Sequence, residues 1–245
     1  MTELKNLSRR SLLAGAGALA AVTIAPNMVL ISAAEAKTAG EAVSAKNRWG
    51  LLIDLTKMSK ATADACVNAC KAENGWDAGT GPHDPQWIRR VDLKDKQSGR
   101  EISLPMMCQH CDKPTCTDVC PTGASFKRAD GIVLVDRHIC IGCRYCMMAC
   151  PYKARSLVFD KIEDQNYHAP RGKGTVEACT LCVHRIDVGE LPACVEASNK
   201  VAPDAMLFGD LKDPDSAIAK KVASVAVTRI RRDLGLEPGV LYHGL

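Results

Sequence analysis

The sequence is short of large aromatic side chains and, after its N-terminal segment, of long apolar runs. Its 245 residues include three Trp, four Tyr and three Phe, so aromatic packing alone would bury little apolar area. No later stretch reaches the roughly 20 apolar residues of a membrane-spanning helix. The 32 basic and 28 acidic residues nearly balance, at a net charge of +4. Since no basic run with interleaved aromatics is present, we expect no nucleic-acid partner.

The motifs of nucleotide and covalent haem sites are also missing. The chain has no Gly-rich phosphate loop and no Cys-x-x-Cys-His sequence, the signatures of bound nucleotide and attached haem. His110, His138 and His184 lie near cysteines in the sequence, where each is either a hydrogen-bond donor to sulfur or an ordinary packed side chain. We therefore expect no catalytic residue and no substrate site in this chain.

Cysteine is abundant, with thirteen residues. Two runs, each closed by proline, contain most of them: Cys108-x2-Cys111-x4-Cys116-x3-Cys120-Pro121 and Cys140-x2-Cys143-x2-Cys146-x3-Cys150-Pro151. The second run has the spacing of bacterial two-cluster ferredoxins, in which the fourth cysteine binds the neighbouring cluster. Zinc sites use paired Cys-x2-Cys knuckles, and a disulfide framework needs no such regularity. The runs therefore predict iron–sulfur clusters.

The first 36 residues have the layout of an export signal. Arg9 and Arg10 precede a mild apolar stretch rich in Ala and Gly, and the small-residue site Ala34-Glu35-Ala36 follows. This layout predicts a twin-arginine signal peptide over residues 1–36, with an uncleaved membrane anchor as the alternative. The twin-arginine route exports folded proteins, so clusters built in the reducing cytoplasm would reach the periplasm intact. Free cysteines there would otherwise form disulfides.

Local sequence patterns predict short elements around the cysteines. In chain order they are a strand at 48–57, a helix at 61–73, a loop-like connection over 74–103, a hairpin over 125–136, and a short strand at 206–208. Residues 216–234 have helical spacing with a basic face, so residues 216–245 are expected to form a C-terminal helical tail. That basic face is either solvated or docks a membrane partner.

Three sequence segments carry a resemblance to a known family: QHCDKPTCTDVCPTGASFKRADGIVLVDRHICIGCRYCMMACPYKAR, CTLCVHR and LFGDL. With the twin-arginine signal, they resemble the four-cluster ferredoxin-like subunits of membrane oxidoreductases, of the DmsB, NrfC and PsrB types. Within that family the chain is similar to the DsrO subunits of the DsrMKJOP complex. The resemblance implies an α+β, loop-rich fold of tandem, pseudo-symmetric two-cluster ferredoxin-like units with short β-hairpins and helices. The inner unit would span 104–160, and the outer unit would combine 37–103 with 161–215.

The resemblance also implies three ligand sets, because the family exchanges fourth cysteines within each unit. Set A is Cys108, Cys111, Cys116 and Cys150; set B is Cys140, Cys143, Cys146 and Cys120; set C is Cys179, Cys182, Cys194 and Cys70. A fourth cluster lacks ligands, since Ser198 stands at one expected position and only Cys66 remains. One thiol and one hydroxyl cannot replace four thiolates. We expect three [4Fe–4S] clusters, no haem, no nucleotide, and a spare buried thiol at Cys66.

Basic residues flank the two cysteine runs, and positive charge near an anionic cluster favours its reduced state and attracts an acidic partner. Each is otherwise an ordinary surface charge. They are Lys127, Arg128, Arg137, Arg144, Lys153 and Arg155.

The function implied by the resemblance is electron transfer in the periplasm. The partners would be a quinone-reactive integral membrane subunit of the NrfD/PsrC type (DsrP-like), a multihaem cytochrome c (DsrJ-like) and other Dsr subunits of dissimilatory sulfur metabolism. One alternative is the same role beside a molybdopterin reductase for thiosulfate, polysulfide or tetrathionate. Others, of a different class, are an iron–sulfur sensor and a structural iron–sulfur or zinc module.

Overall fold

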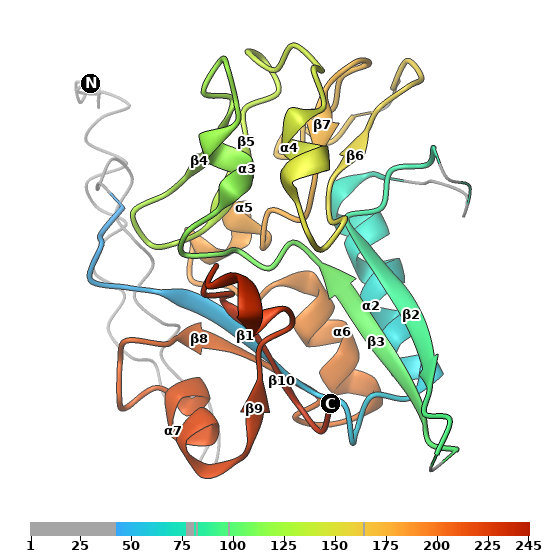
Figure 1. Cartoon of the computed structure of the whole chain (residues 1–245), viewed down its shortest axis with the longest axis vertical. Coiled ribbons are helices and arrows are strands. Elements are labelled where there is room, and N and C mark those ends of the chain that lie inside the picture. Colours follow the sequence, from blue (N-terminus) through green and yellow to red (C-terminus); the bar gives the residue numbers. More distant parts are fainter. Residues whose placement is uncertain (1–42, 77–80, 82, 98, 164) are drawn as a thin grey trace, which may run out of the picture. The chain divides into compact units, whose positions relative to one another are not determined.

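A computed structural model of the chain describes residues 43–76, 81, 83–97, 99–163 and 165–245. The predicted signal peptide, residues 1–36, lies outside the described residues. None of the helices in the described ranges is both long enough and apolar enough to span a bilayer. The fold mixes helices with small sheets (Figure 1), which confirms the predicted α+β class. The tandem pseudo-symmetric arrangement stays a prediction.

A four-stranded sheet lies at one end of the described fold, in the order β8-β1-β10-β9. Strand β1 (Trp49–Asp54) pairs antiparallel with β8 (Met206–Asp210) and parallel with β10 (Val240–His243), which pairs with β9 (Val227–Thr228). Alternate residues of β1 face opposite sides. Leu52 packs with helix α7 (Ala217–Ser224), while Leu51 and Ile53 enter the main core. The predicted strands at 48–57 and 206–208 are confirmed.

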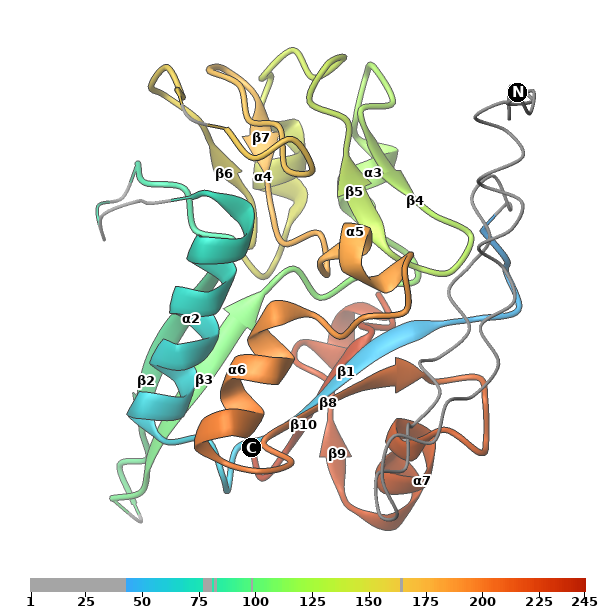
Figure 2. The same ribbon diagram turned by 180° about the vertical axis from the view of Figure 1, so that it is seen from behind.

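Helices α2 (Lys60–Asn74) and α6 (Ala193–Val201) pack side by side against the core (Figure 2). The Ser59 side chain caps α2 by accepting a hydrogen bond from the Thr62 N–H. Gly75 ends the helix in the left-handed conformation, at φ 63°, and its N–H donates to Lys71 O. The predicted helix at 61–73 is therefore confirmed. Since α2 meets α6 and β1 meets β8, segments from the early and late parts of the described chain lie together.

The prediction of a loop-like connection over 74–103 is wrong for its second half. Strands β2 (Ile88–Lys94) and β3 (Glu101–Met107) form an antiparallel hairpin paired along their full length. One end of the hairpin is buried, at Ile88 and Met107, whereas the other, at Lys94 and Glu101, is exposed. The Gly, Pro and charged residues around these strands hid this short pattern in the sequence.

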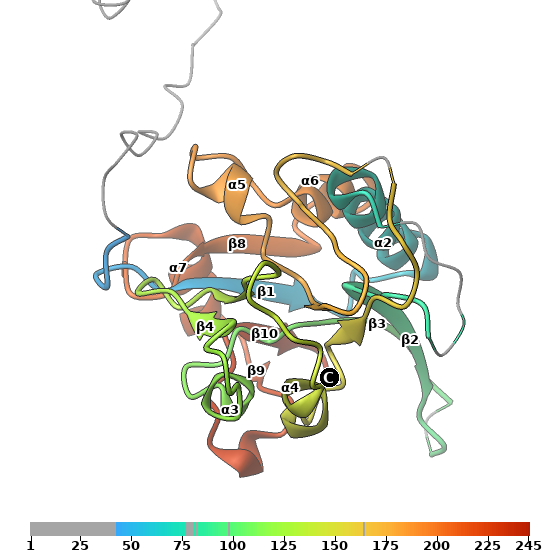
Figure 3. The ribbon, with the colours of Figure 1, turned by 90° about the horizontal axis from the view of Figure 1, so that it is seen from above.

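The two cysteine runs lie among short elements that gather above the sheet in Figure 1. These are α3 (Thr115–Asp118), β4 (Ser125–Lys127), β5 (Val133–Val135), α4 (Tyr145–Ala149), β6 (Ser156–Leu157) and β7 (Val176–Glu177). Strands β4 and β5 form the predicted hairpin, which is confirmed. Figure 3 shows α3 and α4 on one side of β1, and α2, α6 and α5 (Val183–Ile186) on the other.

The prediction of a helical tail over 216–245 is wrong beyond its first turns. Only α7 (Ala217–Ser224) is α-helical; β9, a 3-10 turn at Arg232–Leu234 and β10 follow. The β-branched residues Val225, Val227 and Thr228 favour extended backbone. The final strand β10 inserts beside β1, with Leu241 and Tyr242 fully buried. The end of the chain is thus a structural part of the sheet.

Candidate metal-cluster sites

The structure brings each predicted cysteine set together around its own cavity. Cys108, Cys111, Cys116 and Cys150 of set A line one cavity. Cys120, Cys140, Cys143 and Cys146 of set B line another. Cys70, Cys179, Cys182 and Cys194 of set C line a third. All thirteen cysteines are free thiols. In each set the fourth cysteine comes from a segment distant from the other three.

Left-handed backbone shapes the loops around the cavities. His110, Arg144, Leu181 and Cys182 have φ between 41° and 66°, which is uncommon for residues other than glycine. Gly142 is also left-handed, and a Cβ there would lie 2.1 Å from the carbonyl oxygen of Gly174. Only glycine therefore fits between Ile141 and Cys143. Turns of this kind direct successive backbone N–H groups into an anion-binding hollow.

Backbone N–H groups point at cysteine sulfur in two of the sets. Ser125 N–H donates to Cys120 Sγ, Val176 N–H donates to Cys140 Sγ, and Leu181 N–H donates to Cys179 Sγ, each at 3.4 Å. Hydrogen bonds to sulfur stabilise negative charge on it and are one means by which a protein adjusts a cluster's reduction potential.

Side chains donate to sulfur as well. In set C, Trp76 Nε1–H donates to Cys70 Sγ at 3.3 Å, and Asn74 Nδ2 donates to the same sulfur at 3.6 Å. Neither residue was predicted from the sequence. Their position a few residues after Cys70, in a chain with three tryptophans, was the available signal.

Burial makes these thiols hard to ionise on their own. It raises the pKa of Cys108 to about 12 and that of Cys111 to about 12, with neighbouring sulfurs of set A adding to the effect. In set C, burial and the other thiolates raise the pKa of Cys70 and Cys194 well above the ordinary value. Four thiolates in one dry cavity require compensating positive charge, which iron supplies when it displaces the protons. The donor sets therefore fit iron–sulfur clusters.

The cavities lie in the order C, A, B. Burial raises the pKa of Cys179 in set C, and Cys108 of set A is close enough to add to that rise. Cys116 of set A likewise raises the pKa of Cys146 in set B, where burial is again the larger cause. The cysteines of set C are all buried, whereas Cys120, Cys140 and Cys143 of set B are partly exposed. Cavity B is therefore the one nearest the surface.

The residues at the expected fourth position, Cys66 and Ser198, are packed into the protein interior. Cys66 and Ser198 are both 0 % exposed. Cys66 Sγ donates to Met206 Sδ at 3.5 Å, and Ser198 Oγ donates to Val195 O at 3.0 Å. Burial raises the pKa of the Cys66 thiol to about 11, so it is protonated at neutral pH. The expectation of a buried thiol at Cys66 is confirmed.

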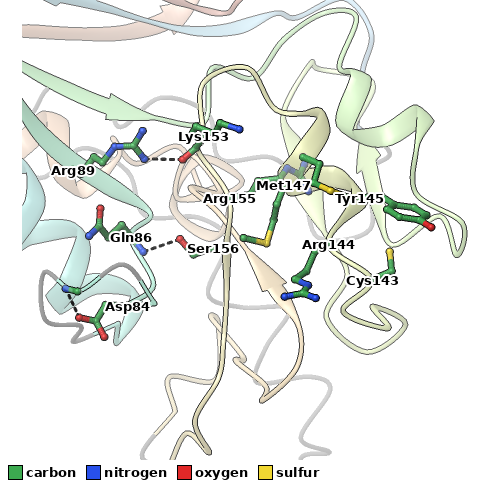
Figure 4. A pocket seen from close by; sticks show the side chains of 12 residues that line it. Asp84, Gln86, Arg89, Cys143, Arg144, Tyr145, Met147, Lys153, Arg155 and Ser156 are labelled. Carbon is green, nitrogen blue, oxygen red and sulfur yellow. Dashed lines mark hydrogen bonds between the residues drawn. The ribbon is translucent and has the colours of Figure 1, made fainter.

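A larger pocket of about 750 Å³ opens beside Cys143 of set B. Figure 4 shows Cys143, Arg144 and Tyr145 on one side of it and Asp84, Gln86 and Arg89 on the other. Met148, in its wall, is 66 % exposed. Arg89 holds one wall of the pocket in place by donating to Lys153 O and Tyr152 O. It was not singled out from the sequence, because it lies in the segment that was predicted to be a loop. The surface next to cavity B is thus both basic and apolar.

Three of the other basic residues singled out from the sequence have structural partners. Lys127 pairs with Asp112 at 2.9 Å, and Arg128 pairs with Asp130 and Asp187 at 2.6 and 2.7 Å. Arg137 forms no ion pair with the described residues; it donates a hydrogen bond to Pro170 O and stacks over the Trp87 ring. These three residues hold loops together.

The three histidines also differ in setting. Burial lowers the pKa of His110 to about 3, and its Nδ1 accepts a hydrogen bond from Val133 N–H at 3.1 Å. His110 is therefore neutral. His184 contacts Glu73 at 2.7 Å, and His138 is exposed.

Comparison with known proteins agrees with this geometry. Residues 101–211 match the family described as a 4Fe-4S dicluster domain. The chain is 41 % identical to the Hdr-like menaquinol oxidoreductase iron-sulfur subunit 1 of Archaeoglobus fulgidus, over 96 % of this chain and 97 % of that protein. It belongs to the family of 4Fe–4S subunits of oxidoreductases. Other members of this family are a tetrathionate reductase subunit of Salmonella typhimurium, 38 % identical over 82 % of this chain and 74 % of that protein, and NrfC of Escherichia coli, 33 % identical over 94 % and 92 %.

Membership of the 4Fe–4S subunit family establishes an iron–sulfur protein of electron transport. The dicluster match covers eleven of the twelve cysteines in sets A, B and C, from Cys108 to Cys194, and leaves Cys70 outside. The members carry different reaction names, so the shared property is the iron–sulfur subunit itself rather than one terminal reaction.

Proposed function

We propose that this protein conducts electrons through three [4Fe–4S] clusters held by sets A, B and C. The observation that carries the proposal is the serial order of three four-cysteine cavities, ending at the partly exposed cavity B. When bound, the clusters supply one-electron transfer without large rearrangement. The chain's own residues hold the iron through thiolates, donate N–H groups to sulfur, and exclude water from cavities A and C.

The position of cavity B suggests where a redox partner exchanges electrons. The side chains of Arg144 and Lys153 make no ion pair or hydrogen bond with the described residues, and Tyr145, Met148 and Ile141 are exposed around Cys143. A basic rim around exposed apolar side chains suits an acidic protein surface that docks transiently. Electrons would pass from there through A to C, or in the reverse direction.

We assign the partners to a quinone-linked membrane complex. A quinone-reactive NrfD/PsrC-like subunit of the DsrP type and a multihaem cytochrome of the DsrJ type are the proposed neighbours, within a Dsr complex of sulfur metabolism. The name of the Archaeoglobus relative, matched over nearly its whole length, supports a quinol partner. The second candidate is the same role in a periplasmic molybdopterin reductase, favoured by the likeness to the tetrathionate reductase subunit of Salmonella.

We further propose a periplasmic location reached through the twin-arginine route. Arg9 and Arg10 followed by the small-residue site at 34–36 support it. Replacing both arginines by lysine in the full chain is expected to leave the protein in the cytoplasm, as measured by cell fractionation. Unchanged export of that variant would contradict the proposal.

The ligand assignment is tested with two matched Cys→Ser variants. In the native membrane complex, Cys143→Ser is expected to remove or alter the EPR signal of one cluster and to slow quinol-driven reduction of the others. Cys66→Ser, a change of the same chemistry outside the three sets, is expected to keep every signal and the rate. Loss of a cluster in the Cys66 variant, or unchanged signals in the Cys143 variant, would refute the assignment.

A further inference from the structure

Arg155 lies between the cavities of sets A and B. It follows the second cysteine run by a few residues, just before β6, and is 5 % exposed. Its Nη2 donates to Cys116 Sγ of set A at 3.1 Å, and the guanidinium is also close enough to Cys146 of set B to interact with it. Arg155 lines cavity A and also the wall of the large pocket beside Cys143 (Figure 4). One guanidinium thus contacts two ligand sets.

The charge of Arg155 has no carboxylate partner in the described part of the chain. By contrast, Arg128 and Arg171 are also shielded from solvent, and each forms an ion pair with a carboxylate. Nη1 of Arg155 is buried and makes no hydrogen bond to any described atom. A buried cation without negative charge nearby is strongly unfavourable. Among the described residues, Arg155 contacts the sulfurs of cluster ligands, which become negatively charged when iron displaces their protons.

Arg155 is cationic, because an arginine guanidinium stays protonated in proteins. Its Nη2 lies 3.1 Å from Cys116 Sγ, and its free Nη1 provides a further donor for sulfur in the same cavity. An anionic cluster bound by set A would supply the negative charge that the buried guanidinium lacks.

We propose that Arg155 is a positioning residue whose charge is shared by clusters A and B and raises the reduction potentials of both. The inference rests on the proposed function. Reduction adds one negative charge to a cluster, so a cation in contact with its ligands favours the reduced form. Because the same cation lies beside both ligand sets, it favours the addition of an electron to either cluster.

The test is an EPR-monitored redox titration of the full chain, purified anaerobically with its clusters. In Arg155→Gln, the ratio of reduced to oxidised cluster at a fixed potential is expected to fall about tenfold for both A and B, equivalent to about 59 mV for a one-electron couple. Cluster C, whose ligands Arg155 does not contact, is expected to stay unchanged. Arg155→Lys keeps the charge and is expected to shift A and B less than threefold.

Lys200→Gln is the control, because Lys200 is an exposed cation near the end of α6 that lines none of the three cavities, and solvent screens its charge. It is expected to shift A and B less than threefold. Equal shifts in the Lys200 and Arg155 glutamine variants, an equal shift of all three clusters, or no shift in Arg155→Gln would overturn the inference.

A measurement on the unmodified protein covers the case in which Arg155→Gln loses iron. With arginine labelled by ¹⁵N, electron–nuclear double resonance on the reduced clusters is expected to detect a guanidinium nitrogen near A and B, and its absence overturns the inference. If the unmodified protein shows no [4Fe–4S] signals, the proposed function itself fails. If it shows them and the Arg155 results are negative, only this inference fails.

Discussion

The buried ion pair between Arg171 and Glu177 ties two walls of cavity C together. Arg171 Nη2 and Nε donate to the Glu177 carboxylate at 2.8 and 3.0 Å, and Nη1 donates to Gly75 O at 2.9 Å. The side chains are 4 % and 0 % exposed. Gly75 ends the helix that carries Cys70, and Glu177 lies two residues before Cys179. The pair therefore connects two ligand-bearing segments of set C.

Glu177→Gln keeps the shape of the side chain but leaves Arg171 buried without a counter-charge. Breaking a buried pair in this way costs about 3–5 kcal/mol, a large share of the ~5–15 kcal/mol by which a typical domain is stable. For a chain of this size, 1 kcal/mol corresponds to roughly 2–4 °C in the unfolding midpoint. We therefore expect a midpoint about 6–20 °C lower, with loss of cluster C before the other two.

The assay is anaerobic thermal unfolding at one fixed scan rate, followed by circular dichroism and by cluster absorbance. Glu163→Gln is the matched control, because Glu163 pairs with Lys161 at 3.0 Å on the surface, where such pairs contribute little. Replacing the pair by apolar residues, as Arg171→Met with Glu177→Leu, is expected to recover most of the lost stability. A midpoint for Glu177→Gln within error of the Glu163→Gln value would refute the reasoning.

Three further predictions concern set C, the filled fourth position and the end of the chain. Trp76→Phe removes the N–H donor to Cys70 Sγ and is expected to lower the reduction potential of cluster C alone, as measured by EPR titration. Ser198→Cys is expected to leave the iron content unchanged, because it and Cys66 would offer two thiols in a packed core; a gain of about four irons would contradict this. Deleting residues 240–245 removes β10 and exposes the edge of β1, so we expect aggregated, iron-poor protein, whereas deleting the final residue alone leaves the iron content normal.

The two cysteine runs could be recognised in the sequence because cluster geometry constrains the spacing of the ligands, whereas the division into three sets followed from the resemblance to a family. In the second run, two short gaps separate three cysteines and the last gap carries the fourth thiolate away, so the chemistry leaves a local pattern. The left-handed turns at His110 and Arg144 leave no such pattern in the sequence. Among these turn residues, Gly142 is the one whose type indicates left-handed backbone. The donor Trp76 was close to Cys70 in the sequence, but only its packing shows that its N–H faces the sulfur.

The errors arose where pairing between distant segments decides the structure. Strand β10 lies next to β1 although nearly the whole described chain separates them, and no local pattern encodes that contact. The helical spacing of 216–234 was real for α7, but the β-branched residues after Ser224 join the sheet instead. Arg155 could be identified as one of six basic residues near cysteines, whereas its burial between two cavities depends on the folded arrangement of α4 and β6.

The most direct test of the account is the content of iron and acid-labile sulfide in anaerobically purified, fully assembled protein. Three [4Fe–4S] clusters predict about twelve irons and about twelve sulfides per chain, with EPR signals from three interacting centres. About sixteen of each would mean that the position of Cys66 and Ser198 holds a fourth cluster, and about eight would mean that set C holds none. Either result would contradict a chain of three clusters in the order C, A, B.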